Sequence, residues 1–174
     1  MSNNEIVQKL WNLCDVLRDD GINYADYVTE LVLLLFIKME HENAQSGVML
    51  GHKLPEGARW PDIAKLDGPN LLNHYRETLL GLSQSTDPLI SAIYADAQTR
   101  MKEPRHLKQL ISAIDSIDWY SAQRDGLGDL YEGLLEKNAT ETKSGAGQYF
   151  TPRPSTDTTV ALINPHAGET VQAP

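Results

Sequence analysis

The stretch with the greatest chemical potential lies near the carboxyl end and reads Gly145-Ala-Gly-Gln-Tyr-Phe-Thr-Pro-Arg-Pro154. Its two glycines allow the backbone to approach a ligand closely. Two aromatic rings follow beside two short hydrogen-bonding side chains, and two prolines then stiffen the exit. This combination suits a loop that closes over a small planar ligand. The alternative is a surface loop whose rings pack onto the core, and residue chemistry alone favours that alternative because glycine and proline mark loops generally.

No other residues form a group that indicates catalysis or metal binding. Carboxylates are plentiful, but none stands in a pattern typical of acid–base chemistry. The histidines are scattered, with no pair one helical turn apart and no cysteine partner; they are His41, His52, His74, His106 and His166. We therefore predict no metal site and no catalytic residue within this chain.

One short segment is basic in an otherwise acidic chain, and it comprises Arg100, Lys102, Arg105, His106 and Lys108. Such a cluster could contact phosphates. A solvated helix face is the commoner meaning of this pattern and is the interpretation we favour.

Composition indicates one globular core of ordinary size. The chain has 174 residues, 41% of them hydrophobic, and a formal net charge of −9, which argues against a surface that grips DNA throughout. The single cysteine, Cys14, lies on an apolar stripe, excludes an internal disulfide and fits a cytoplasmic protein. We expect no cleavable signal, and the longest apolar run, Leu31 to Ile37, is too short to span a membrane.

Hydrophobic periodicity predicts an all-α, mainly helical fold. The first helix follows a capping-box pattern at residues 2–5 and ends at residues 19–21, and a second begins at Asn23 and is buried nearly all round. Residues 41–70 read as a long connection with short turns or a small hairpin. Later helices are expected over residues 71–82, 88–101, 104–117, 125–135 and from about 154, the last with Val160, Ala161 and Ile163 on its inner face.

The segment from Gly145 to Pro154 resembles the segment ahead of the catalytic domain in the modification (M) subunits of type I restriction-modification systems. Leu54-Pro-Glu-Gly-Ala-Arg-Trp60 is similar to a second segment of the same subunits, so the resemblance extends over most of the chain. It implies an S-adenosylmethionine-dependent, adenine-specific N6 DNA methyltransferase. By the same resemblance, the cofactor site would include Gln148, Tyr149, Phe150, Thr151, Pro152 and Arg153.

The resemblance also implies a domain organisation. Residues 1–137 would form the helical N-terminal domain, and residues 138–174 a cofactor-loop linker with the first residues of a Rossmann-like methyltransferase domain, whose first strand would start at Thr170. Two positions depart from the family pattern: Ala173 replaces an aspartate, and Ser155-Thr156 replace apolar residues.

The family's glycine turn and its Asn-Pro-Pro-Phe/Tyr motif are absent from these 174 residues, so we expect the chain alone to be inactive. The implied partners are DNA, the specificity and restriction subunits, and a second M subunit. The competing hypothesis is a stand-alone acidic helical interaction module without enzymatic activity.

Overall fold

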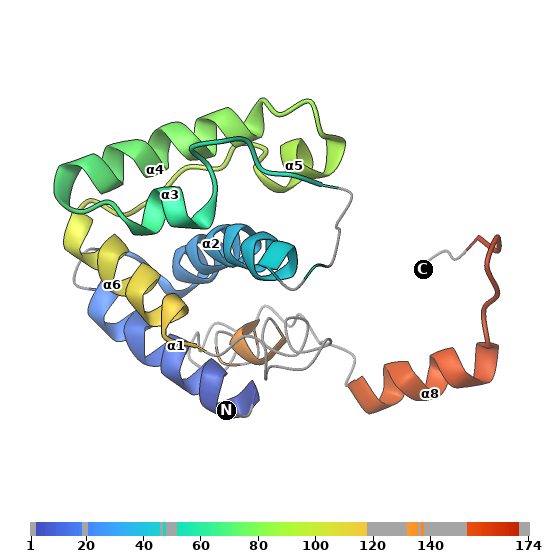
Figure 1. The fold of residues 1–174 in the computed structure, drawn as a ribbon. Coiled ribbons are helices and arrows are strands. Elements are labelled where there is room, and N and C mark those ends of the chain that lie inside the picture. Colours follow the sequence, from blue (N-terminus) through green and yellow to red (C-terminus); the bar gives the residue numbers. More distant parts are fainter. Residues whose placement is uncertain are drawn as a thin grey trace. The chain divides into compact units, whose positions relative to one another are not determined.

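The computed structural model describes residues 3–18, 21–45, 47, 52–117, 132–135, 137 and 153–170. All regular secondary structure in this part is α-helical, which confirms the predicted fold class (Figure 1). The chain forms two compact units, Met1–Lys143 and Ser144–Pro174. The predicted domain boundary after residue 137 stays a prediction.

Helix α1 spans Asn3–Arg18 and buries the apolar face that the periodicity predicts. Cys14 is fully buried on this face. The helix ends as expected near Gly21, whose φ of 79° is a left-handed conformation that suits glycine. The Gly21 amide donates to the Arg18 carbonyl, and the Ile22 amide to the Leu17 carbonyl, so a Schellman motif satisfies the last carbonyls.

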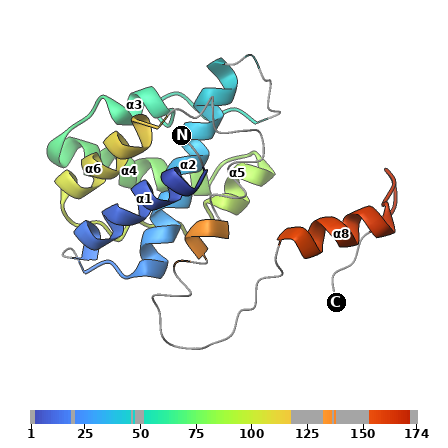
Figure 2. The same ribbon diagram turned by 90° about the horizontal axis from the view of Figure 1, so that it is seen from below.

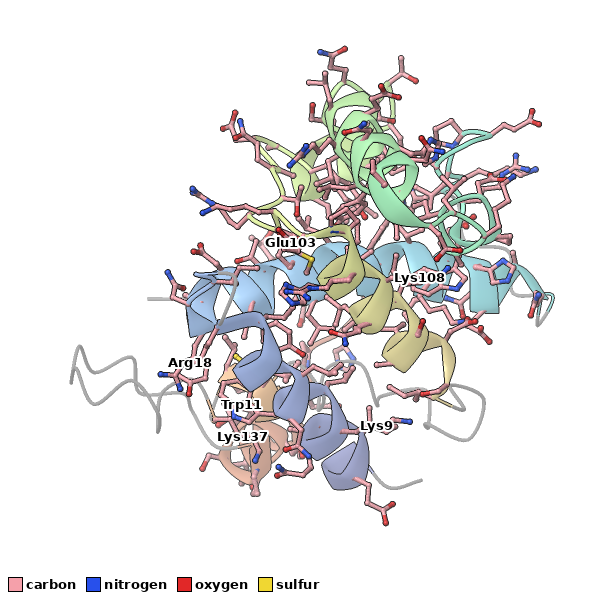
Figure 3. The ribbon with its side chains drawn as sticks, turned by 90° about the vertical axis from the view of Figure 1, so that its left-hand side faces the viewer. Lys9, Trp11, Arg18, Glu103, Lys108 and Lys137 are labelled. Atoms are coloured by element: carbon pink, nitrogen blue, oxygen red, sulfur yellow. The ribbon has the colours of Figure 1, made fainter. Side chains whose placement is uncertain are left out.

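Helix α2 spans Tyr24–Gln45 and is the central helix of the first unit. The side chain of Asn23 accepts a hydrogen bond from the Asp26 amide (2.8 Å) and so caps the amino end. Leu31, Leu34 and Ile37 are fully buried. Figures 1 and 3 show α2 passing between α4 and α1, which confirms the prediction of a helix surrounded by core.

Residues 41–70 differ from the prediction of an irregular connection. Helix α2 continues to Gln45, and a short helix α3 spans Trp60–Ala64. Proline in its first turn and the burial of Trp60 and Ile63 account for α3, since two apolar residues three apart share one helical face. The described residues of this region contain no strand, so the hairpin alternative is wrong there.

Two longer helices complete the core of the first unit. Helix α4 spans Gly68–Ser83 and α6 spans Pro104–Asp115, and both bury the predicted apolar faces. Helix α4 ends at Ser83, one residue beyond the predicted end at residue 82, and Gly81 lies inside its last turn. In Figure 2, α1, α2 and α6 lie side by side, and contacts join each pair of them.

Helix α5 spans Pro88–Ile93 and is shorter than predicted. The expected cap is present, because one Asp87 oxygen accepts from the Leu89 and Ile90 amides. The prediction of a helix to residue 101 is wrong: Asp96 has φ 55°, a left-handed conformation that ends helical pairing. The Tyr94 hydroxyl donates to the Leu33 carbonyl on α2 (2.8 Å) and so holds the end of α5 against α2.

Residues 132–135 and 137 are helical, and the first four lie within the helix predicted for residues 125–135. Leu134 is fully buried in the core cluster. A Cβ atom on Gly133 would lie 3.0 Å from a methyl group of Val7, so this backbone passes very close to α1. Lys137 also donates to the Gln8 side chain on α1 (2.6 Å). The segment is therefore part of the first unit's core.

Candidate functional site

The predicted cofactor-binding residues fall mainly outside the described part of the chain. This applies to Gln148, Tyr149, Phe150, Thr151 and Pro152, and to the expected strand beyond Thr170. Arg153 is the first residue of helix α8, and only its backbone is described. The assignment of these residues to a cofactor site stays a prediction.

Helix α8 spans Arg153–Ile163 and follows the predicted cofactor segment directly. Proline at its second position is compatible with a first helical turn, where no intrahelical donor is needed. The Thr158 and Thr159 hydroxyls donate to carbonyls one turn earlier (2.7 and 2.8 Å). Asn164, with φ 47°, ends the helix, and its amide donates to the Val160 carbonyl (2.8 Å). The local sequence thus specifies a short helix with defined ends.

The apolar side chains of α8 are exposed, contrary to the predicted inner face. Val160 is 52% exposed, Leu162 81% and Ile163 70%. The physical reason is that the described part of its unit contains a single helix with a following turn, and one helix cannot cover its own side chains. The pattern correctly predicts a helix, but the described part of this unit supplies no cover for its apolar side.

The basic residues near α6 do not form one phosphate-contacting surface. Arg100, Lys102 and Arg105 are exposed, whereas His106 is buried in the core. Lys108 projects from α6 (Figure 3) and donates to the carbonyls of Ala64 and Leu66, both at 2.9 Å. It also pairs with Asp67 (3.0 Å), so its ammonium group stabilises the connection between α3 and α4.

A buried cation joins three helices, and sequence reasoning missed it. Lys38 directly follows the apolar run of α2 and is itself buried, and its ammonium group pairs with Asp115 on α6 (2.8 Å) and Glu42 (2.9 Å). The same Asp115 oxygen accepts from the Trp60 indole (2.9 Å) on α3. The hydrogen bond from Lys38, aided by that from Trp60, lowers the pKa of Asp115. The arrangement holds helices together and offers no open reactive group.

The described residues contain no group of three or more histidine, cysteine, aspartate or glutamate side chains that could hold a metal ion. None of the described helices is both long enough and apolar enough to cross a membrane. The geometry of this part of the chain is that of a helical core with a separate, exposed helix after it.

Two family comparisons divide the chain almost completely between them. Residues 6–114 match the HsdM N-terminal domain, and residues 122–174 match the N-6 DNA Methylase family. The chain belongs to the HsdM N-terminal domain family. The second match contains Gly133 and Lys137, which contact α1, as well as α8 and the predicted cofactor segment.

Curated relatives resemble the chain over its whole length. The type I restriction enzyme StySPI methylase subunit of Salmonella potsdam is 47% identical over 178 residues. The EcoKI methylase subunit of Escherichia coli (strain K12) is also 47% identical over 178 residues. Each comparison covers 100% of this chain and 33% of the relative, so the chain spans about a third of the length of these relatives.

Solved structures support the same assignment. The crystal structure of the type I restriction enzyme EcoKI M protein aligns with a TM-score of 0.58 and 35% identity, covering 92% of this chain and 27% of that one. A chain from a structure of the type I R-M system aligns with a TM-score of 0.63 over 94% of this chain, at 24% identity, and supports the fold. The chain therefore corresponds to the N-terminal region of type I methylase subunits.

Proposed function

We propose that this chain acts as the N-terminal part of a methyltransferase subunit that modifies adenine N6 in DNA. The observation that carries the proposal is 47% identity to two type I methylase subunits across the whole chain. A stand-alone interaction module is not favoured, because residues 122–174 match the N-6 DNA Methylase family.

The cofactor of the whole protein would be S-adenosylmethionine, which supplies the transferred methyl group. Within this chain, the residues assigned to hold it are Gln148, Tyr149, Phe150, Thr151, Pro152 and Arg153. Their aromatic faces and hydrogen-bonding groups suit an adenine-containing ligand. The chain supplies one wall of such a site, so we expect it to bind the cofactor weakly by itself.

The partners proposed for the whole protein are DNA, a specificity subunit, a restriction subunit and a second methylase subunit. One comparison structure concerns complex assembly of the type I R-M system, which supports a multisubunit setting. The helical unit would serve subunit contacts, because the chain's net charge of −9 does not favour general phosphate binding. By the family resemblance, it would also help to enclose DNA.

The direct test is a methyl-transfer assay on the complete subunit purified with its specificity subunit. We expect radioactive methyl groups from S-adenosylmethionine to enter DNA as N6-methyladenine, identified after enzymatic digestion. The matched control is the same subunit without residues 1–143. We expect this shortened subunit to lose activity, because the helical unit would be required for assembly. The proposed function would be refuted if the complete assembly methylated cytosine, or if it methylated no base at all.

A further inference from the structure

One short segment belongs to one family by sequence and to another part of the protein by fold. Residues 132–135 and 137, which we call the anchor segment, lie in the part of the chain that matches the N-6 DNA Methylase family. In the structure they lie in the first compact unit, which extends to Lys143. The predicted cofactor residues begin at Gln148, eleven residues after Lys137.

An apolar contact fastens the anchor segment to α1. The Gly133 backbone lies so near α1 that a Cβ atom there would be 3.0 Å from a methyl group of Val7. Glycine is a poor helix former, but at this position its missing side chain makes the close approach possible. The next residue, Leu134, is fully buried in the core. The backbone of the anchor segment is therefore held directly against α1.

A polar contact fastens the same segment one turn further on. The Lys137 ammonium group donates to the Gln8 side-chain oxygen on α1 (2.6 Å), and Figure 3 shows Lys137 beside this helix. The Gln8 side-chain nitrogen donates to the Asn12 side chain (2.6 Å), which turns the Gln8 oxygen toward Lys137. The two contacts with α1 thus come from residues four apart in the anchor segment, which share one helical face.

We propose that Gly133 and Lys137 are positioning residues for cofactor binding, because they fix the point from which the chain runs into residues 148–153. This role rests on the proposed function, which assigns those residues to the cofactor site. Closing a loop over a ligand costs more free energy when its fixed end lies farther away, and each doubling of the loop length lowers the affinity about threefold. An anchor near the cofactor residues reduces this cost before the ligand arrives.

A purely structural role of the anchor segment makes a different kinetic prediction. Loss of stability lowers the fraction of folded enzyme, so the apparent kcat falls while the KM for S-adenosylmethionine is unchanged. Loss of positioning weakens cofactor binding in the folded enzyme, so this KM rises while kcat at saturating cofactor is nearly unchanged. The two roles are therefore separated by measuring both constants on the complete methylase subunit with its specificity subunit.

The first variant forces the anchor segment away from α1. In Gly133→Val the side chain would overlap Val7, and we expect the KM for S-adenosylmethionine to rise about threefold or more. Val7→Ala makes room, so the double variant should bring KM back toward the wild-type value. The control is Leu79→Ala in α4, a buried residue whose truncation destabilises the core without touching the anchor segment. It should leave KM unchanged.

A second pair of variants uses the polar contact and avoids the core. Gln8 is exposed, and Gln8→Lys would bring a second ammonium group against that of Lys137. Because exposed charge pairs contribute little, we expect KM to rise only about twofold. Adding Lys137→Glu restores an attractive pair and should reverse the rise. This pair keeps the test decisive even when Gly133→Val fails to fold.

The double variant Phe150→Ala with Thr151→Ala separates failure of this role from failure of the proposed function. If it raises KM, while Gly133→Val and Gln8→Lys raise KM no more than Leu79→Ala does, the positioning role is refuted and the cofactor site stands. A rise in KM that neither Val7→Ala nor Lys137→Glu reverses would also refute the role. If none of the variants changes KM, the cofactor assignment fails, and the positioning role fails with it.

Discussion

Leu134 and helix α8 both belong to the part of the chain that matches the N-6 DNA Methylase family, but their apolar side chains are buried to opposite degrees. Leu134 is fully buried, and Gly133 lies against Val7 of α1. Leu162 and Ile163 of α8 are 81% and 70% exposed. The boundary between two sequence families is therefore not the boundary of the folded core.

This difference has a physical basis in how much apolar surface each segment can cover. Gly133 and Lys137 have α1 as an immediate neighbour, whereas α8 belongs to a unit whose described part offers no second helix. Burial of apolar area stabilises only where a partner surface exists. We expect α8 to gain such a partner in a complete methylase subunit.

The largest expected effect is a difference in the free energy of unfolding when one leucine of each region is replaced by alanine. Leu134→Ala should lower the free energy of unfolding by about 2–5 kcal/mol, because it leaves a cavity in a packed core. Leu162→Ala should change it by less than about 0.5 kcal/mol, because the side chain is exposed. Urea unfolding of both variants of the 174-residue chain measures the contrast. Similar losses in both variants would mean that α8 is packed in solution.

A second prediction concerns pH and the groups of the packed unit. Burial raises the pKa of Glu30, so its folded value lies above its unfolded value. Its contribution is then complete at low pH and is lost as pH rises through the folded pKa. Glu30→Gln should remove this loss, so its melting temperature relative to wild type should rise as the pH increases above the usual carboxyl range.

The matched control for the pH prediction is Asp115→Asn. The pKa of Asp115 is lowered by its hydrogen bond from Lys38, so its contribution is present above the usual carboxyl range and is lost as pH falls. This variant should reduce stability at neutral pH and make little difference in acid. If the melting temperature of Glu30→Gln varied with pH in parallel with that of the wild type, the raised pKa of Glu30 would be contradicted.

The smallest expected effect tests the close approach of residues 132–137 to α1. Gly133→Ala gains helix propensity of up to about 1 kcal/mol, but its methyl group meets Val7 at 3.0 Å. The two terms should nearly cancel. In the Val7→Ala background the same change should become stabilising, with a coupling of about 0.5–1 kcal/mol in a double-mutant cycle. Additive effects would show that the two residues are not in contact.

The sequence predicts most of the helices because their signals are local. The apolar repeats of α1, α4 and α6 and the Asp87-Pro88 start of α5 are each set within a few residues. The length of α5 could not be predicted in this way. It ends where Tyr94 bonds to α2 and Asp96 adopts a left-handed conformation, and α2 is distant in sequence.

The charged residues inside α2 show the same limit. Glu30 and Lys38 flank an apolar run, and apart from Glu42, one turn after Lys38, nothing nearby identifies their partners. Those partners are the Arg100 amide and Asp115, which are 70 and 77 residues away in the chain. The candidate cofactor segment has the opposite character: its residues are evident from the sequence, while Gln148 to Pro152 lie outside the described structure.

The most direct test of the central claim is the double substitution Phe150→Ala with Thr151→Ala, measured on two properties. In the complete methylase subunit, we predict that the affinity for S-adenosylmethionine and the rate of DNA methylation both fall by about tenfold or more, since stacking and hydrogen-bonding groups are lost. In the 174-residue chain, we predict an unchanged melting temperature. A lower melting temperature with intact cofactor affinity would contradict the account and would assign these residues to core packing.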